Sequence, residues 1–376
     1  MLLWWLRGVR GNLALQVNHC MTVMCQRTLF VLLLSLLWGG NALGSQLDVY
    51  FIDVEGGQST LLVTPGKQSL LIDTGWAADG VPGAAPGDPH KARDANRIVA
   101  AARDAGITQI DYLLITHFHP DHDGGVAELS QLIPIRHFID HGSLPPAAAG
   151  DRETRSAYEV YRAIRDKAPH IEPQPGDVLP LKGVEAVVVA SATKVLAKPL
   201  PAAGQMTATC RSSAMPARDV IENPRSTGIV VNFGRFRFLD VGDLSGQPLF
   251  DLACPRSLIG PVDVYLVAHH GGADVSDPAT FAAFAPRVAI MNNGVQKGGA
   301  RETYATLHHV AGLADVWQLH RSESAGEQNF PAAQIANVDD STAVWIRLTA
   351  QDDGSFRILN ARTGEWRSYP ARPTVR

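Results

Sequence analysis

The chain has 376 residues, of which 45% are hydrophobic and 19% charged, a composition typical of a globular protein with a sizeable core. The first 44 residues contain three of the 33 Lys and Arg residues and none of the 37 Asp and Glu residues, so the remainder has a formal charge of −7. This balance gives no general attraction for nucleic acid, whose binding depends on basic side chains that neutralise phosphates. A local basic groove around Arg211, Arg218 and Arg225 is the alternative to a solvated loop there.

The N-terminal segment has the pattern of a secretory signal peptide. Residues 29–38 form an apolar run that follows Arg27 and precedes the small residues Ala42 and Gly44. This run is shorter than the roughly 20 residues that a membrane span requires, which favours a cleaved signal over an uncleaved anchor. We therefore expect residues 1–44 to be an upstream extension plus a signal peptide.

The mature chain is expected to be one exported domain, residues 45–376, that is periplasmic or secreted and has no stable membrane span. Met24 is a candidate for the true start of the precursor. Two of the four cysteines lie before residue 45, which leaves Cys210 and Cys254. An oxidising compartment permits a disulfide between these two, but a pair of free thiols is equally consistent with the sequence.

Short apolar strands alternate with helical segments along the mature chain, and no internal repeat stands out. Long irregular loops are expected at 76–90 and 192–225. Strands that alternate with helices in both halves predict two sheets packed together with helices outside. The expected strands are 47–54, 59–63, 69–72, 110–115, 135–139, 184–189, 229–231, 236–239, 262–267, 288–291 and 316–319 with a final hairpin at 343–360, and the expected helices are 92–105, 126–132, 153–167 and 278–284.

A histidine-rich motif directly follows the expected strand 110–115. Residues 116–125 read Thr-His-Phe-His-Pro-Asp-His-Asp-Gly-Gly, which places three imidazoles and one carboxylate within six positions. Imidazole nitrogen and carboxylate oxygen are the ligands that Zn²⁺ and similar divalent ions prefer. A polar loop that happens to be rich in histidine rarely follows a buried strand with this spacing. We therefore expect a divalent metal site here, with ligands among His117, His119, Asp121 and His122.

Two later strands end in residues of the same kind. Asp243 follows the strand 236–239, and His269 follows the strand 262–267. Strand ends are where ligand sites of α/β proteins gather. Together with the motif at 116–125, this order of residues resembles the metallo-β-lactamase superfamily. The segments 51–54, 71–75, 242–244 and 268–272 are similar to the hydrolase domain of ComEC/Rec2-type DNA uptake proteins and their stand-alone relatives.

The resemblance implies a fold and a metal centre. The fold is an α/β (α+β) four-layer αββα sandwich of two mixed sheets. The cofactors are two divalent metal ions, Zn²⁺ with Mn²⁺ or Fe as alternatives, which lower the pKa of a shared water so that hydroxide forms at neutral pH. Asp121 is also a candidate for orienting that hydroxide or accepting its proton. By the resemblance, His117 and His119 hold one ion, Asp121, His122 and His269 hold the other, and Asp243 bridges the two.

The third histidine of the first ion is missing from its usual place. The strand 184–189 ends in Ala190 and Ser191, neither of which is a metal ligand of this type. His141 is the best replacement because it ends a strand, follows an Asp and precedes a Gly, while His137 and His170 are weaker alternatives. Without a third ligand, the first ion would bind weakly or the enzyme would use one metal.

Further residues have smaller expected roles. His270 and His320 are candidates for contacting the substrate or donating a proton to the leaving group, with a structural hydrogen bond as the alternative for each. Asp73 is expected to orient the metal loop through hydrogen bonds. Gly124 and Gly125 would let the backbone approach the site closely.

The expected function is that of an exported hydrolase acting on a small-molecule substrate, with a phosphoester as the first choice of bond. The alternatives are hydrolysis of a lactone or β-lactam, or a metal-stabilised binding protein with little catalysis. The acidic balance of the mature chain disfavours long DNA as a substrate but not a small phosphoester.

Overall fold

The computed structural model describes residues 45–373 except 79, 81–84, 86, 213 and 340. The expected signal peptide and the candidate start at Met24 lie outside the described residues. Within the described part of the chain, no helix is long and apolar enough to cross a membrane.

The first sheet has nine strands and is mixed. Its antiparallel half joins the first described strand to the C-terminal strands, because β1 pairs with both β2 and β16. Strands β3 to β6 are parallel. The order is β18 (Glu365–Tyr369), β17 (Phe356–Asn360), β16 (Ile346–Gln351), β1 (Gln46–Phe51), β2 (Thr60–Val63), β3 (Ser69–Ile72), β4 (Ile110–Leu114), β5 (Ile135–Ile139) and β6 (His170–Ile171).

The second sheet is also mixed and is built from the middle of the chain. Strands β7, β8, β10 and β11 are antiparallel neighbours, and β11 to β15 are parallel. The order is β15 (Ile335–Asn337), β14 (Asp315–His320), β13 (Val288–Met291), β12 (Val264–Leu266), β11 (Phe236–Asp240), β10 (Gly228–Phe233), β8 (Glu185–Ser191) and β7 (Val178–Leu179), and β9 (Lys194–Val195) pairs with β8.

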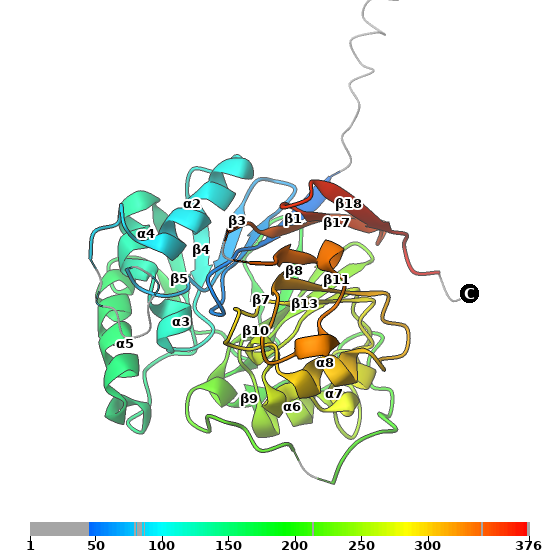
Figure 1. Ribbon diagram of the computed structural model, residues 1–376. Coiled ribbons are helices and arrows are strands. Elements are labelled where there is room, and N and C mark those ends of the chain that lie inside the picture. The colour runs from blue at the N-terminus through cyan, green and yellow to red at the C-terminus, as the bar shows by residue number, and fades with distance from the viewer. Residues whose placement is uncertain are drawn as a thin grey trace, which may run out of the picture. The chain divides into compact units, whose positions relative to one another are not determined.

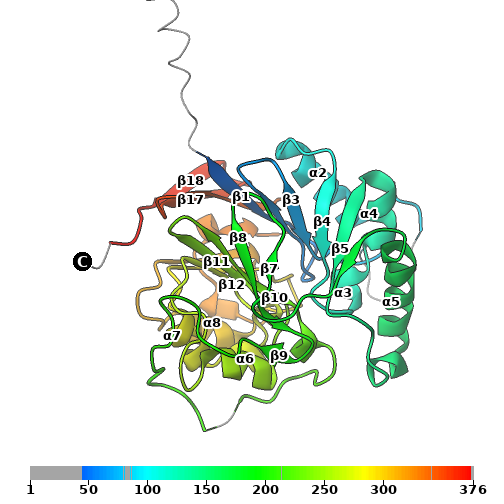
Figure 2. The same cartoon turned by 180° about the vertical axis from the view of Figure 1, so that it is seen from behind.

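Helices cover the outer face of each sheet, as Figures 1 and 2 show. Helices α2 (Arg93–Asp104), α4 (Val126–Leu132) and α5 (Arg152–Arg165) pack on the first sheet, where Ile98, Leu129 and Tyr161 join one buried cluster with Leu113 of β4. Helices α6 (Gly246–Ala253), α7 (Pro278–Phe284) and α8 (Arg301–Leu307) pack on the second sheet. Each of these helices buries one apolar side, which is how a short helix is stabilised in a domain.

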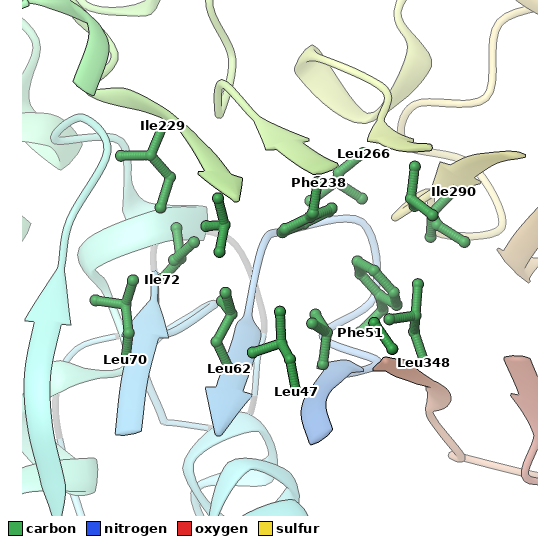
Figure 3. Packing of buried hydrophobic residues seen from close by; sticks show 14 of the residues in the cluster. Leu47, Phe51, Leu62, Leu70, Ile72, Ile229, Phe238, Leu266, Ile290 and Leu348 are labelled. Carbon is green, nitrogen blue, oxygen red and sulfur yellow. The ribbon is translucent and has the colours of Figure 1, made fainter. Parts of the chain in front are cut away.

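The two sheets pack against each other through a shared core. Successive side chains of a strand point to opposite faces, so Leu47 and Phe51 of β1 face this core while Tyr50 faces the outer helices. Figure 3 shows residues of the first sheet opposite Phe238 and Ile290 of the second. The predicted αββα sandwich of two mixed sheets is therefore confirmed.

The sequence prediction missed several short elements, among them helix α6 and strand β18. Helix α6 begins with Gly246 and has Pro248 in its first turn, and both residue types are typical of turns and loops. Strand β18 is an edge strand that is exposed apart from Tyr369, and its Glu and Arg residues give no apolar alternation. Helix α6 packs against α7, which lies further along the chain, whereas β18 pairs with the adjacent strand β17.

Candidate metal centre

The candidate site forms where loops from the two sheets meet. The histidine motif follows β4 and runs into the short helix α3 (Pro120–Asp123), Asp243 follows β11, and the histidine pair after β12 lies in a short 3₁₀ turn, His269–Gly271. The loops are in close contact at Gly242, whose φ is +54° and where a Cβ would lie 2.8 Å from the side chain of Thr116. Only glycine fits this approach and this backbone angle.

Four buried side chains converge in this region. One ligand atom from each of Asp121, His122, Asp243 and His270 lies within 4.8 Å of the others. The Nε2 atom of His122 is 3.2 Å from Oδ2 of Asp121 and 3.3 Å from Oδ2 of Asp243. The Nε2 atom of His270 is 3.2 Å from Oδ2 of Asp121 and 3.3 Å from Oδ1 of Asp243. We refer to these four residues as the ligand group.

The ligand group fits a divalent metal ion. Within the described residues, Nε2 of His122, Nε2 of His270 and Oδ1 of Asp243 are buried without a hydrogen-bond partner. Buried polar atoms in folded proteins nearly always have a hydrogen-bond partner or a bound ion. These three atoms therefore indicate a bound group that is not part of the protein chain. Two imidazoles and two carboxylates form a donor set of the kind that Zn²⁺ binds.

The charges of the ligand group also suit a cation. Burial alone would raise the pKa of Asp121, but the positive charges of Lys297 and His122 hold it well below the usual range. Burial likewise opposes ionisation of Asp243, and neighbouring histidines hold the pKa of its carboxyl well below the usual range. Both carboxylates therefore carry negative charge at neutral pH, and a bound cation would compensate it.

Asp73 orients one imidazole of the ligand group. Its Oδ2 lies 2.7 Å from Nδ1 of His122, which directs Nε2 toward Asp121 and Asp243. The same carboxylate accepts hydrogen bonds from the backbone N–H and the hydroxyl of Thr116 at 2.7 and 2.8 Å. This arrangement is the one expected of a residue that supports a metal-binding histidine from behind.

The structure places the two adjacent histidines differently. His270 belongs to the ligand group, whereas Nε2 of His269 is 3.8 Å from Asp243 and accepts a 3.2 Å hydrogen bond from Nδ2 of Asn223. The Nδ1 atom of His269 is 2.9 Å from Asp274. The sequence motif predicted that His269 is a metal ligand and that His270 contacts the substrate or donates a proton. Both residues have positive φ, and the sequence alone does not reveal how such a turn directs neighbouring side chains.

His117 and His119 lie next to the ligand group without belonging to it. The Nε2 atom of His117 is 2.9 Å from Nδ1 of His119 and 3.9 Å from Oδ2 of Asp243. Burial, with the charges of the neighbouring histidines, lowers the pKa of His117 well below its usual value. His117 is therefore neutral at physiological pH, which is the form of imidazole that binds a metal.

His141 contacts a carboxylate that sequence analysis did not single out. Its Nε2 lies 3.1 Å from Oε2 of Glu222, and the same oxygen accepts a 3.0 Å hydrogen bond from the backbone N–H of Phe118. Among the described residues, no group of three converging ligands includes His117, His119 or His141. The role of His141 as a third ligand therefore stays a prediction.

The segment 219–223 of the long loop is a part of the site that sequence analysis missed. Asp219 lies 3.9 Å from Nε2 of His119, Glu222 contacts His141, and Asn223 contacts His269. The loop is attached to the end of α6 by a disulfide between Cys210 and Cys254. A Glu-Asn pair just before a strand was the only sequence signal, and it is a weak one.

Lys297 places a positive charge at the ligand group. Its Nζ contacts Oδ2 of Asp121, donates a 2.9 Å hydrogen bond to the backbone oxygen of Gly56, and lies 5.2 Å from the ring centre of Trp76. The side chain of Lys297 is 39% exposed.

His320 lies in a separate buried network. Its Nε2 is 2.6 Å from Oδ1 of Asp53, and this carboxylate also binds Arg97 at 2.9 Å. Asp53, Glu55 and His320 form a second place where three potential ligands converge, but Arg97 contacts both acids and supplies the compensating charge. The contacts of His320 are those of a structural hydrogen bond.

Sequence comparison matches residues 53–211 to a family model described as the metallo-beta-lactamase superfamily. Two curated relatives are atrochrysone carboxyl ACP thioesterases. The one from Aspergillus terreus is 33% identical over 95 residues, 24% of this chain and 25% of the relative. The one from Passalora fulva is 37% identical over 84 residues, 22% of this chain and 21% of the relative. The chain thus spans about a quarter of the length of these relatives.

Similar solved structures include the metallo-beta-lactamase fold protein YhfI from Bacillus subtilis. It is 11% identical, with 73% of this chain and 96% of that chain covered and a TM-score of 0.43. Another is CmlA, a diiron beta-hydroxylase from Streptomyces venezuelae, at 16% identity, with 73% of this chain and 53% of that chain covered and a TM-score of 0.41.

Proposed function

We propose that this chain, a metallo-beta-lactamase-fold enzyme by its architecture and its family-model match, is an exported metal-dependent hydrolase of phosphoesters. The observation that supports metal dependence is the ligand group. It places two imidazole nitrogens and two ionised carboxylates around one point and leaves three of their atoms without partners in the described chain.

Each residue near the ligand group has a distinct proposed part in binding and hydrolysis. Asp121, His122, Asp243 and His270 would hold one ion. His117, which lies near Asp243, and His119, which contacts His117, would hold a second. Divalent ions in such a site lower the pKa of water and polarise the bond under attack. Asp73 fixes the orientation of His122. His269, hydrogen-bonded to Asp274, would hold or donate a proton at the edge of the group.

Two observations support an anionic substrate. Lys297, whose side chain is 39% exposed, places its ammonium beside Asp121, where it could bind a phosphoryl oxygen. The motif segments 51–54 and 268–272 resemble those of ComEC-type hydrolase domains. Both favour a phosphoester over a neutral lactone or lactam.

A carboxylic thioester is the second candidate substrate. Both curated relatives are named as thioesterases, and they are 33% and 37% identical to this chain over the matched segments. A metal centre of this kind can polarise a thioester carbonyl as well as a phosphoryl group.

Two observations support export. The leader has the composition of a signal peptide, and the Cys210–Cys254 disulfide is of a kind that persists in oxidising compartments. Fractionation of cells that express the full chain would test export, and recovery of the protein in the cytosol with its leader intact would contradict it.

The test of the reaction is a substrate panel with the purified mature protein, supplied separately with Zn²⁺ and Mn²⁺. We expect hydrolysis of bis(4-nitrophenyl) phosphate that is abolished in Asp243→Ala and retained in the control His309→Ala, which alters an exposed residue of the second half. Hydrolysis of a thioester or a lactone without hydrolysis of phosphoesters would contradict the proposed substrate class and assign the other one. Bound metal with no turnover of any substrate would favour a binding protein.

A further inference from the structure

A cavity of about 420 Å³ lies beside His119. His119 connects it to the ligand group, because His119 contacts His117 and His117 approaches Asp243. A substrate bound at the ligand group could therefore extend one of its substituents into this space. The cavity is lined by His119, Ala147, Ala148, Asp151, Thr154, Asp219, Ile221 and Glu222.

The charge of the cavity lining is negative. Asp151, Asp219 and Glu222 contribute carboxylates, and no Lys or Arg is among the lining residues. Two of these carboxylates accept hydrogen bonds from backbone N–H groups. Asp151 accepts from Thr154 at 2.7 Å, and this hydrogen bond lowers the pKa of Asp151. Asp219 accepts from the backbone of residues 221–223.

Glu222 provides an independent indication that a ligand is missing. Its side chain is only 1% exposed, and Oε1 is buried without a hydrogen-bond partner among the described residues, while Oε2 is used by Phe118 and His141. A buried carboxylate oxygen is energetically unfavourable unless a cation or a hydrogen-bond donor interacts with it.

The lining also contains small aliphatic side chains. Ala147, Ala148 and Ile221 contribute methyl and methylene groups to it. Acidic groups combined with short aliphatic walls are complementary to an alkylammonium group, which has a positive centre surrounded by methyl or methylene groups.

We propose that this cavity binds an alkylammonium group of the substrate, so that the enzyme prefers phosphodiesters in which one ester substituent is an aminoalcohol. This inference rests on the proposed phosphoesterase function and names its substrate class. The hydrolytic step adds water across the P–O bond and releases an alcohol and a phosphomonoester, and the ammonium group takes no part in bond breaking.

The test compares two phosphodiesters that differ in one atom. They are 4-nitrophenyl phosphorylcholine and 4-nitrophenyl 3,3-dimethylbutyl phosphate, in which carbon replaces the charged nitrogen. We expect kcat/KM to be at least about tenfold higher for the choline ester, a difference of about 1.4 kcal/mol. Asp151→Asn, which keeps a side-chain oxygen for the helix cap, should reduce this ratio several-fold. Glu159→Gln, which removes an exposed charge from the same helix α5, should leave the ratio unchanged. A ratio of one or less in the wild type overturns the inference.

A binding measurement separates this inference from the proposed function. Calorimetric titration of the metal-loaded protein with choline should show saturable binding that weakens in Asp151→Asn and not in Glu159→Gln. If neither ester is hydrolysed but choline binds in this way, the proposed reaction fails and the cavity assignment stands. If choline gives no saturable binding and the charged ester is not preferred, the cavity assignment is wrong even where the protein hydrolyses phosphoesters.

Discussion

The carboxylate of Asp73 and the imidazole of His122 are joined by a 2.7 Å contact that fixes which nitrogen of the ring faces the ligand group. Both side chains are fully buried, so solvent does not compete for this contact. The pKa of His122 is raised well above its usual value because nearby Asp243, Asp121 and Asp73 outweigh the effect of burial. Without a metal ion, the neighbouring carboxylates favour the protonated imidazole. A bound metal ion would take the place of the proton at Nε2.

Asp73→Asn should lower metal affinity by roughly 10–100-fold, since a neutral amide supports the histidine less well as a ligand. Competition titration with a chromogenic chelator measures this change. Asp94→Asn is the matched control, because Asp94 is an equally buried carboxylate that binds Arg93 and the backbone of Trp76 instead. Equal metal affinity in Asp73→Asn and wild type would remove Asp73 from the site.

Replacement of the two adjacent histidines should have unequal effects on metal content. His270→Ala removes a member of the ligand group and should reduce bound metal, whereas His269→Ala should retain metal and lower turnover. Metal analysis after gel filtration, together with turnover of a chromogenic substrate, distinguishes the two variants. Loss of metal in His269→Ala with retention in His270→Ala would restore the assignment expected from the sequence motif.

These two histidines also show what the sequence could and could not predict. The metal motif at 116–125 was recognisable because its ligands are local and follow a buried strand. Which neighbour of a histidine pair joins the group depends on a turn with positive φ. Glu222 contacts the backbone of Phe118, 104 residues earlier, and a separation of this size leaves no local pattern. The strands that were predicted were recognisable for the same reason as the motif, because their apolar pattern is local.

Removal of the disulfide should destabilise the protein and loosen the segment 219–223. Cys210 and Cys254 are 44 residues apart, and a crosslink over such a loop contributes about 4 kcal/mol in the chain-entropy model. Urea denaturation of Cys210→Ser/Cys254→Ser should therefore show a lower free energy of unfolding by about 2–5 kcal/mol. Hydrogen exchange of residues 219–223 should also become faster. Unchanged stability in the double variant, with the wild type confirmed as oxidised, would contradict this.

The Asp53–His320 pair should make stability depend on pH in a defined direction. Burial lowers the pKa of His320, but the hydrogen bond and charge of Asp53 raise it above 6.5 overall. The contribution of His320 to the stability of the fold is therefore fully present below pH 6.5. It is lost as the pH rises through the raised pKa of His320. Burial raises the pKa of Asp53, but its hydrogen bond and charge interaction with His320 lower it overall below 3.8, so its contribution is present above pH 3.8.

The free energy of unfolding should consequently differ most between wild type and His320→Gln from pH 3.8 to pH 6.5. This difference should shrink above pH 6.5. Chemical denaturation at a series of pH values measures it, and the exposed His309→Gln is the control. A difference that grows with rising pH would show that His320 is neutral in the folded protein.

The ligand group takes Asp121 and His122 from the loop after β4 and Asp243 and His270 from loops of the other sheet. Neither half of the chain can form this group separately, and contact between the loops at Gly242 and Thr116 requires the sheets to be docked. A metal ion held by this group would therefore need both sheets in place, and it would link the two sheets directly.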